Sequence, residues 1–354
     1  MLDVIRKQLR SLEYDALLVT SPSNRRYVTG FPSSAGVAVL TETKGYFFTD
    51  SRYIEAAERS VKGFQVEESS RETPYPALVN RVIREHRIKT IALEADYLTY
   101  ASYCKWKEDL AAETVPAGDV FAALRTVKSQ WEKEQIRKAQ AIAEKAFEAV
   151  LPAIRAGATE QEIAAALCYQ MLRHGAERMS FDPIVVAGEK SSMPHGTPDG
   201  NVVRRGDFVT MDFGCMQRGY CSDMTRTVAV EEASEEMRQV YETVLAAQNA
   251  GIQTVRAGVP AAAPDQAARR IIEDAGYGVY FGHGFGHGVG LEIHEGPVES
   301  PASGDMLAAG NVVTAEPGIY LPGNFGVRIE DMLYITEDGC ENLTKTPKDL
   351  IILP

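Results

Sequence analysis

The chain has 354 residues, 45% of them hydrophobic, and its 37 basic against 49 acidic residues leave a formal net charge of −12. This length is sufficient for two domains that each bury a core of their own. The acidic balance, without any basic cluster, argues against a nucleic acid or an anionic membrane as a partner.

Cysteine usage and the first residues of the chain bear on the cellular compartment. The five cysteines are odd in number and widely scattered, which is a poor disulfide framework and indicates a reducing environment. Residues 1–30 contain no uninterrupted apolar core of signal-peptide length, and no stretch approaches the ~20 apolar residues of a membrane span. We therefore expect a cytoplasmic protein.

Residues 1–126 alternate short apolar segments with helical patterns, which is typical of an α/β domain with a layered sheet. We find no phosphate-binding loop or dinucleotide fingerprint in this part of the chain. The predicted strands span residues 16–20, 36–40, 45–49 and 90–94, and the predicted helices span residues 3–12, 51–59 and 76–86.

A long helix is predicted for residues 129–151. Ser129 is a suitable N-cap with Glu132 three residues later, and apolar residues then recur at helical spacing up to Val150. We expect the domain boundary just before this helix. The predicted division is an N-terminal domain of residues 1–126, a linker of residues 127–133 and a C-terminal domain of residues 134–354.

The C-terminal part contains a faint internal repeat. Residues 154–157 (Ile-Arg-Ala-Gly) recur 101 residues later as residues 255–258 (Val-Arg-Ala-Gly). Each copy precedes a helical stretch that ends at a glycine, Gly175 or Gly276, and then a hairpin that carries two acidic residues. This order predicts a duplicated half-domain.

The first of these hairpins spans residues 207–230. A turn is expected within residues 214–219, centred just after Gln217. This centre places Asp212 directly opposite Asp223 on the return strand.

The second hairpin spans residues 311–336, with Pro322-Gly323-Asn324 as its turn signal. A turn centred on Gly323 places Glu316 directly opposite Glu330. Both hairpins are therefore expected to present a pair of facing carboxylates.

Facing carboxylates predict a metal site. Opposed residues on antiparallel strands have Cβ atoms ~5 Å apart, where like charges destabilise, and apolar neighbours such as Met211 and Ile319 add a cost of burial. Four carboxylates balance two divalent cations, and oxygen-rich coordination favours Mn²⁺, with Co²⁺ and Zn²⁺ as the alternatives. Paired ions of this kind activate water for amide hydrolysis.

Histidines in glycine-rich stretches extend this candidate site. His283 and His287 lie in residues 282–290, where glycine alternates with larger residues and leaves one face of an extended chain bare for close backbone approach. The two histidines are ~13 Å apart at strand rise, so one can bind a metal while the other reaches the substrate. His294 and His195 are the further candidates.

Five blocks of the C-terminal part resemble the pita-bread metallopeptidases, in the correct order and over essentially the whole domain. The blocks are residues 211–214 (MDFG), 220–227 (YCSDMTRT), 282–295, 314–318 (TAEPG) and 327–331 (VRIED). The resemblance implies an α+β pita-bread catalytic domain with an internal pseudo-twofold repeat.

The resemblance also implies a dinuclear metal centre. Its ligands would be Asp212, Asp223, His287, Glu316 and Glu330. Asp223 and Glu330 would bridge the two ions, and Glu316 would also shuttle protons.

Further residues are assigned around the substrate by the same resemblance. His195, His283 and His294 match positions that contact the substrate or the reaction intermediate, and Arg328 matches a supporting arginine. Phe181 corresponds to an apolar position beside the pocket for proline.

The N-terminal part separates the subfamilies. Residues 49–53 (TDSRY) look like the creatinase-type N-terminal α/β domain of Xaa-Pro peptidases, and Pro194-His195-Gly196 is similar to the same group. This resemblance implies hydrolysis of the Xaa-Pro bond in peptides with proline at the second position, by a homodimer. Creatinase shares the architecture without metals, whereas this chain keeps every ligand position.

The expected length of the substrate depends on one position at which this chain departs from the dipeptidase members of the family. Some dipeptidase members carry an arginine a few residues after the His-Glu pair, suited to the carboxylate of a dipeptide. Here Val298 follows His294-Glu295-Gly296-Pro297, and whether Arg328 substitutes stays open. We expect aminopeptidase P-like cleavage of longer peptides, with dipeptides also accepted as by a prolidase.

Two alternatives accompany this prediction. A methionine aminopeptidase shares the five ligands but consists mostly of the catalytic domain. A catalytically silent peptide-binding module on the same fold would have broken ligand positions, whereas all five positions are intact here.

Overall fold

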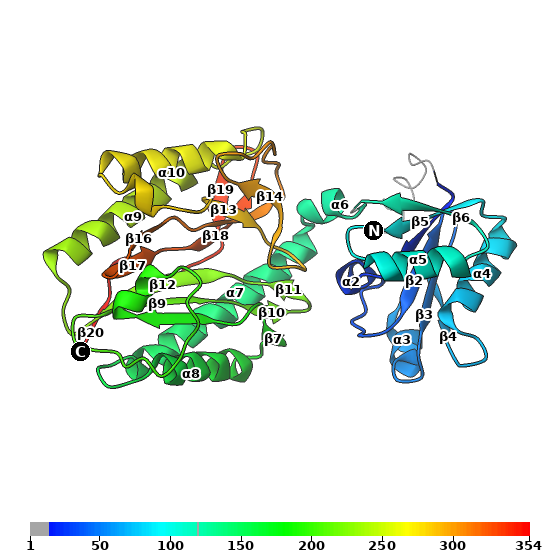
Figure 1. Cartoon of the computed structure of the whole chain (residues 1–354), viewed down its shortest axis with the longest axis horizontal. Helices are drawn as coiled ribbons and strands as arrows, with labels where there is room; N and C mark the ends of the chain where they lie inside the picture. The colour runs from blue at the N-terminus through cyan, green and yellow to red at the C-terminus, as the bar shows by residue number, and fades with distance from the viewer. Residues whose placement is uncertain (1–13, 119) are drawn as a thin grey trace. The chain divides into compact units, whose positions relative to one another are not determined.

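The computed structural model describes residues 14–118 and 120–354. The chain forms two compact units that divide between Leu124 and Arg125 (Figure 1). Within the described ranges, no helix is long and apolar enough to cross a membrane. The helix predicted for residues 3–12 lies outside the described residues.

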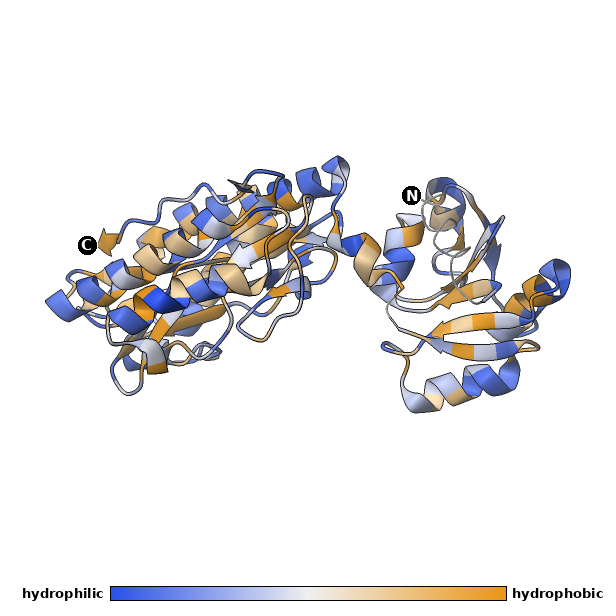
Figure 2. Cartoon of the chain, turned by 90° about the horizontal axis from the view of Figure 1, so that it is seen from above, coloured by the Kyte–Doolittle hydropathy of each residue, from blue (hydrophilic) through white to orange (hydrophobic). Residues whose placement is uncertain are grey.

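The first unit is an α/β domain around one six-stranded sheet with the order β4-β3-β2-β1-β5-β6. β2 runs antiparallel to both β1 and β3, whereas β3–β4, β1–β5 and β5–β6 are parallel pairs. Its central strands are buried. Their hydrophobic residues are orange in Figure 2. The elements are β1 (Ala16–Val19), α2 (Pro22–Thr29), β2 (Val37–Thr41), β3 (Gly45–Thr49), α3 (Ile54–Ser60), β4 (Phe64–Glu68), α4 (Tyr75–His86), β5 (Thr90–Glu94), α5 (Tyr100–Asp109), β6 (Glu113–Ala117) and α6 (Ala122–Thr126).

The central elements of this unit match the sequence predictions. Residues 45–49 and 90–94 are β3 and β5, β1 and α4 differ from the predicted bounds by one residue at one end, and β2 is shifted by one residue. The helix expected from residue 51 begins only at Ile54, because the three residues before it form a turn. Five elements were not predicted: α2, β4, α5, β6 and α6.

The second unit has β-strands between α7 and α8 on one side and α9 and α10 on the other (Figure 1), as expected for a pita-bread domain. The helices are α7 (Gln130–Val150), α8 (Glu160–Arg173), α9 (Glu235–Thr254) and α10 (Ala262–Asp274), with 3₁₀ turns η1 (Leu151–Ala153), η2 (Gly188–Ser192) and η3 (Gly278–Tyr280). The strands are β7 (Arg178–Met179), β8 (Ile184–Ala187), β9 (Phe208–Phe213), β10 (Cys215–Gln217), β11 (Tyr220–Cys221), β12 (Met224–Val230), β13 (Gly286–Gly288), β14 (Glu295–Glu299), β15 (Val312–Ala315), β16 (Gly318–Leu321), β17 (Phe325–Arg328), β18 (Asp331–Ile335), β19 (Cys340–Asn342) and β20 (Ile352–Leu353).

α7 confirms the predicted long helix. Ser129 caps it in a capping box with Glu132, and the helix ends at Val150. Its apolar stripe, including Ile136 and Phe147, is buried. Most of this stripe packs with α8 and the strands of the first half into one hydrophobic core.

The internal repeat is confirmed by matching hydrogen bonds. Gly157 N–H donates to Val203 O at 2.9 Å, and Gly258 N–H, 101 residues later, donates to Leu307 O at 2.8 Å. α8 and α10 end alike as well, because Gly175 and its counterpart 101 residues on both take a positive φ. The duplicated halves therefore share their backbone construction.

The predicted register of the first hairpin is wrong by two residues. Asp212 pairs with Thr225 rather than with Asp223. The turn is centred on Arg218 and Gly219, which both have positive φ, because a two-residue turn of this kind requires left-handed conformations that glycine adopts readily.

The strands of this hairpin are also interrupted. A Cβ on Gly214 would lie 1.8 Å from Ser222 O, so the two chains approach there at a distance that only glycine permits. Asp223 consequently lies in the gap between β11 and β12 rather than within a ladder.

The predicted register of the second hairpin is confirmed. Its two ladders, β15 with β18 and β16 with β17, share one register centred on Gly323. Glu316 and Glu330 lie between these ladders, at the position where they face each other.

Candidate active site

All ten residues singled out from the sequence line one cavity of about 550 Å³ in the second unit. They come from both halves: β9 and the loops that contain residues 181, 195 and 223 belong to the first half, and β13, β17 and the loops that flank the strands from β13 to β18 belong to the second. The ten residues are Phe181, His195, Asp212, Asp223, His283, His287, His294, Glu316, Arg328 and Glu330.

The centre of this cavity is a cluster of carboxylates around one imidazole. Asp223, His287 and Glu330 each offer an atom within 4.8 Å of the others. His287 Nε2 lies 3.6 Å from Asp223 Oδ2 and 3.3 Å from Glu316 Oε1.

The strand that carries His287 fits between two neighbours because it consists of glycine on either side of the histidine. A Cβ on Gly286 would lie 2.2 Å from Thr314 O, and one on Gly288 would lie 2.2 Å from Gly296 O. The alternating glycines therefore allow the close backbone approach that the sequence predicts.

Backbone contacts also orient the ring of His287. Its Nδ1 lies 3.1 Å from Gly288 O, and since a carbonyl only accepts, Nδ1 carries the proton. Nε2 then presents a lone pair to Asp223 and Glu316, which is the form of histidine that binds metals. The Thr314 hydroxyl accepts from His287 N–H at 3.0 Å and donates to Glu316 Oε1 at 3.1 Å.

The electrostatics of the cluster are unfavourable without a cation. Burial, followed by the neighbouring carboxylates, raises the pKa of Asp223 and of Glu330 well above the usual range. Burial raises the pKa of Glu316 to about 7 and lowers the pKa of His287. The fold thus concentrates negative charge where solvent cannot stabilise it.

The donor atoms fit a divalent metal. Asp212 Oδ1 and Asp223 Oδ1 are buried and have no hydrogen-bond partner, although buried polar atoms are almost always paired. Carboxylate oxygens with one imidazole nitrogen suit hard or borderline divalent ions.

The side chain of Arg328 is buried beside this cluster, and all three of its guanidinium nitrogens donate hydrogen bonds within the second unit. Nη2 donates to Asp212 Oδ2 at 2.7 Å, Nη1 to the Tyr320 hydroxyl at 2.7 Å, and Nε to Thr225 Oγ1 at 3.1 Å. Arg328 therefore neutralises one side of Asp212 and leaves the other side of this carboxylate facing the cluster.

Tyr320 extends this network to His283 and was not predicted. His283 Nδ1 lies 2.8 Å from Gly284 O and so carries the proton, which makes Nε2 the acceptor for the Tyr320 hydroxyl at 2.9 Å. Burial and the charge of Arg328 lower the pKa of His283 to about 4. The sequence gives no signal for Tyr320 because its partners lie on other elements.

The other two histidines occupy different environments. The ring of His294 contacts that of His287, with centroids 4.4 Å apart, and burial lowers the pKa of His294. His195 is exposed in the loop after η2 and faces the cavity with Phe181, which is half-buried. Four imidazoles therefore line the cavity.

Glu295, the neighbour of His294, is buried away from the cavity. Its carboxylate accepts from Arg125 Nη2 at 2.7 Å and from Lys128 Nζ at 3.1 Å, and these two cations are also buried. Burial of Arg125, Lys128 and Glu295 together fixes the backbone of the segment that carries His294.

Comparison with known proteins agrees with this geometry. Residues 134–337 match the model of metallopeptidase family M24, and residues 1–127 match the creatinase/prolidase N-terminal domain. An uncharacterized peptidase of Bacillus subtilis, YqhT, is 40% identical over 356 residues, which cover 99% of each chain.

Two solved structures resemble the whole chain. An Xaa-Pro dipeptidase from Bacillus anthracis has a TM-score of 0.96 at 40% identity and covers 100% of both chains. An X-Pro aminopeptidase from Thermotoga maritima has a TM-score of 0.92 at 37% identity and covers 98% of this chain and 99% of its own. The chain therefore belongs to metallopeptidase family M24, whose members use divalent metal ions, and joins a pita-bread catalytic domain to a creatinase-type N-terminal domain.

Proposed function

We propose that this chain hydrolyses the bond between the first residue of a peptide and a proline at the second position. The observation that carries the proposal is the buried cluster around His287, with its two unpaired carboxylate oxygens, in a cavity lined by imidazoles. The relatives named Xaa-Pro dipeptidase and X-Pro aminopeptidase support this specificity.

Two divalent ions would be held by five side chains. When bound, such a pair lowers the pKa of water and polarises the scissile carbonyl. Mn²⁺ is the ion that we propose, because the donor set is rich in oxygen. The five ligands are Asp212, Asp223, His287, Glu316 and Glu330.

The remaining residues move protons and position the substrate. Glu316 would accept the proton of the attacking water and deliver it to the proline nitrogen as the C–N bond breaks. Arg328 holds Asp212 in place, and His195, His283 and His294 surround the substrate.

Proline at the second position fits the apolar wall of the cavity. Its ring removes the amide hydrogen and fixes φ, so that a peptidase for this bond needs shape rather than an acceptor for that nitrogen. Phe181, Pro183, Ile184 and Pro198 line the cavity and provide such a wall.

Charge in the cavity favours substrates longer than a dipeptide. Of the described residues that line it, Arg328 is the single arginine or lysine, and its nitrogens are engaged by Asp212, Tyr320 and Thr225. Val298 offers no charge to a terminal carboxylate. We therefore propose aminopeptidase P-like cleavage, with dipeptides as poorer substrates.

The test is hydrolysis of Ala-Pro and Ala-Pro-Ala by the Mn²⁺-loaded protein, with a chelated sample as control. We expect metal-dependent cleavage of both peptides and a higher kcat/KM for the tripeptide. A preference for the dipeptide would contradict the proposed length specificity, and cleavage of neither would contradict the Xaa-Pro assignment.

Assembly and location complete the proposal. The five cysteines are unpaired, which suits a reducing cytoplasm. The family resemblance implies a homodimer, which sedimentation velocity of the purified protein would test by its mass.

A further inference from the structure

Glu330 lies at a break in the sheet. β17 ends at Arg328 and pairs with β16, whereas β18 begins at Asp331 and pairs with β15. Neither ladder includes Ile329 or Glu330, so ordinary strand pairing does not hold the backbone of Glu330 in place.

β12 of the first half supplies the missing partners. Glu330 N–H donates to Thr225 O at 3.1 Å, and the Thr225 hydroxyl donates to Glu330 Oε2 at 2.7 Å. The next residue, Arg226, donates from Nη1 to Glu330 O at 2.6 Å and to Thr225 O at 2.9 Å. A single guanidinium group thus joins the backbones of the two halves beside the carboxylate cluster.

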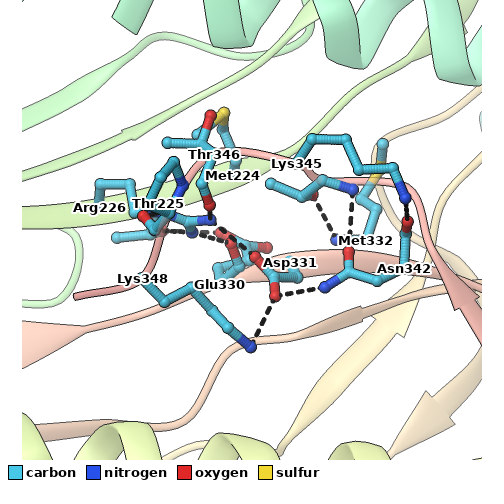
Figure 3. Close-up of polar contacts among 12 residues, drawn as sticks. Met224, Thr225, Arg226, Glu330, Asp331, Met332, Asn342, Lys345, Thr346 and Lys348 are labelled. Carbon is cyan, nitrogen blue, oxygen red and sulfur yellow. Dashed lines mark hydrogen bonds and ion pairs between the residues drawn. The ribbon is translucent and has the colours of Figure 1, made fainter. Parts of the chain in front are cut away.

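The other two nitrogens of the Arg226 guanidinium, Nη2 and Nε, bind residues that follow Glu330 in the chain. Nη2 donates to Asp331 Oδ1 at 2.9 Å and to Thr346 O at 2.7 Å, and Nε donates to Pro347 O at 3.1 Å (Figure 3). All five N–H groups are therefore used, in a side chain that is 2% exposed. A lysine has three donors and no planar fork, so it cannot make this set of contacts.

Asp331 balances the charge of Arg226 and has partners of its own. Its Oδ2 accepts from Asn342 Nδ2 at 2.7 Å and from Lys348 Nζ at 3.1 Å (Figure 3). Both oxygens of the Asp331 carboxylate are thereby engaged by hydrogen-bond donors. Of these two adjacent acids, Asp331 therefore lies among cations, whereas Glu330 belongs to the carboxylate cluster.

We propose that Arg226 is a positioning residue for the metal centre. By fixing the backbone of Glu330 across the break in the sheet, it holds this carboxylate toward Asp223 and His287 and sets the affinity for the divalent ion. The inference rests on the proposed function, in which Glu330 is a ligand.

Calorimetric titration of the metal-free, full-length protein with Mn²⁺ tests this role. Arg226→Lys keeps the charge but loses the fork, and we expect it to weaken Mn²⁺ binding by about tenfold or more, as loss of partners that orient metal ligands does. At saturating Mn²⁺, kcat for Ala-Pro-Ala should fall while KM stays near the wild-type value.

Glu144→Ala is the matched control for a merely structural role. Glu144 Oε1 accepts the N–H of Thr346 at 2.6 Å, so it anchors the same segment as Arg226 without contacting Glu330. We expect a lower melting temperature and unchanged Mn²⁺ affinity. Wild-type Mn²⁺ affinity in Arg226→Lys, or equal weakening in both variants, would overturn the proposal.

A milder variant tests the proposal if the Arg226→Lys protein does not fold. Asp331→Asn keeps an acceptor for Nη2 but removes the charge that holds the guanidinium, and it should also weaken Mn²⁺ binding. A folded Asp331→Asn protein with wild-type Mn²⁺ affinity would overturn the proposal. If the wild-type protein neither binds Mn²⁺ nor cleaves Ala-Pro-Ala, it is the proposed function that fails.

Discussion

Glu316 and Glu330 face each other at the point where the second hairpin passes from one sheet to the next. The pairings on either side, Ala315 with Asp331 and Gly318 with Arg328, have the same register, so the break does not shift one chain against the other. Two buried acids held in this way repel each other unless a cation lies between them. Removal of a carboxylate charge or a change of pH should therefore alter the stability of the metal-free protein.

Asp223→Asn should abolish turnover and Mn²⁺ binding together, because it removes a carboxylate proposed to hold the ions. The same change should stabilise the metal-free protein by about 1–2 kcal/mol, since the carboxylate is buried among like charges. Calorimetric titration measures the binding of Mn²⁺, and urea denaturation measures the stability of the metal-free protein. Asp338→Asn, at an exposed turn, is the control that should change neither, and retained turnover in Asp223→Asn would contradict the ligand assignment.

The metal-free protein should lose stability as the pH rises. The pKa of Glu316 is about 7 in the folded state against 4.5 ordinarily, so between these values only the folded protein keeps the proton. The contribution is complete below about pH 4.5 and is lost above about pH 7, on the order of 3 kcal/mol for this group.

Urea denaturation with chelator across this pH range measures the decline. Glu316→Gln should make the decline smaller, because one titrating carboxylate is gone while Asp223 and Glu330, whose pKa values are also raised, remain. Saturating Mn²⁺ should reverse it, because ligands bind metal in their deprotonated form. Stability that rises with pH in the chelated wild-type protein would contradict the prediction.

Glu295→Gln should destabilise the fold by about 3–5 kcal/mol, because it removes the buried carboxylate charge that Arg125 and Lys128 share. Glu292 contacts Arg125 as well but is 47% exposed, so Glu292→Gln should cost less than about 1 kcal/mol. Denaturant unfolding of both variants measures the difference, and equal costs would show that burial of Glu295 is not what matters.

Val298→Arg should shift the substrate preference toward dipeptides. Val298 lines the cavity and is 46% exposed, so a longer side chain has room to reach a terminal carboxylate. We expect KM for Ala-Pro to fall by about tenfold, the effect of one charge-assisted hydrogen bond, with little change for Ala-Pro-Ala. Val298→Met is the control for size alone, and an equal effect of both substitutions would exclude the charge as the cause.

The sequence predicts the residues of the site better than their pairing. The register around Gly323 follows from a turn with a clear centre, whereas the first hairpin turns at Arg218 and Gly219, one residue later than its composition indicates. Asp212 and Asp223 nevertheless line one cavity, because a register error of two residues keeps side chains on the same face.

Elements without an apolar pattern could not be predicted. β4 and β6 are the edge strands of their sheet, and α5 has no buried residue, so their side chains are largely polar and carry little periodicity. The partners of Arg226 are similarly hidden, since Glu330 and Thr346 are 104 and 120 residues away in the chain. Contacts of this kind depend on the assembled fold.

The 101-residue repeat has a consequence for the origin of the site. One half holds Asp212 and Asp223 and the other holds Glu316 and Glu330, so neither half alone has the complete set of acids. A primitive chain of one half could have built such a centre only by associating with a second copy of itself. Fusion of the two copies into one polypeptide would then have freed each half to diverge, so that today only the second carries the histidine of the cluster.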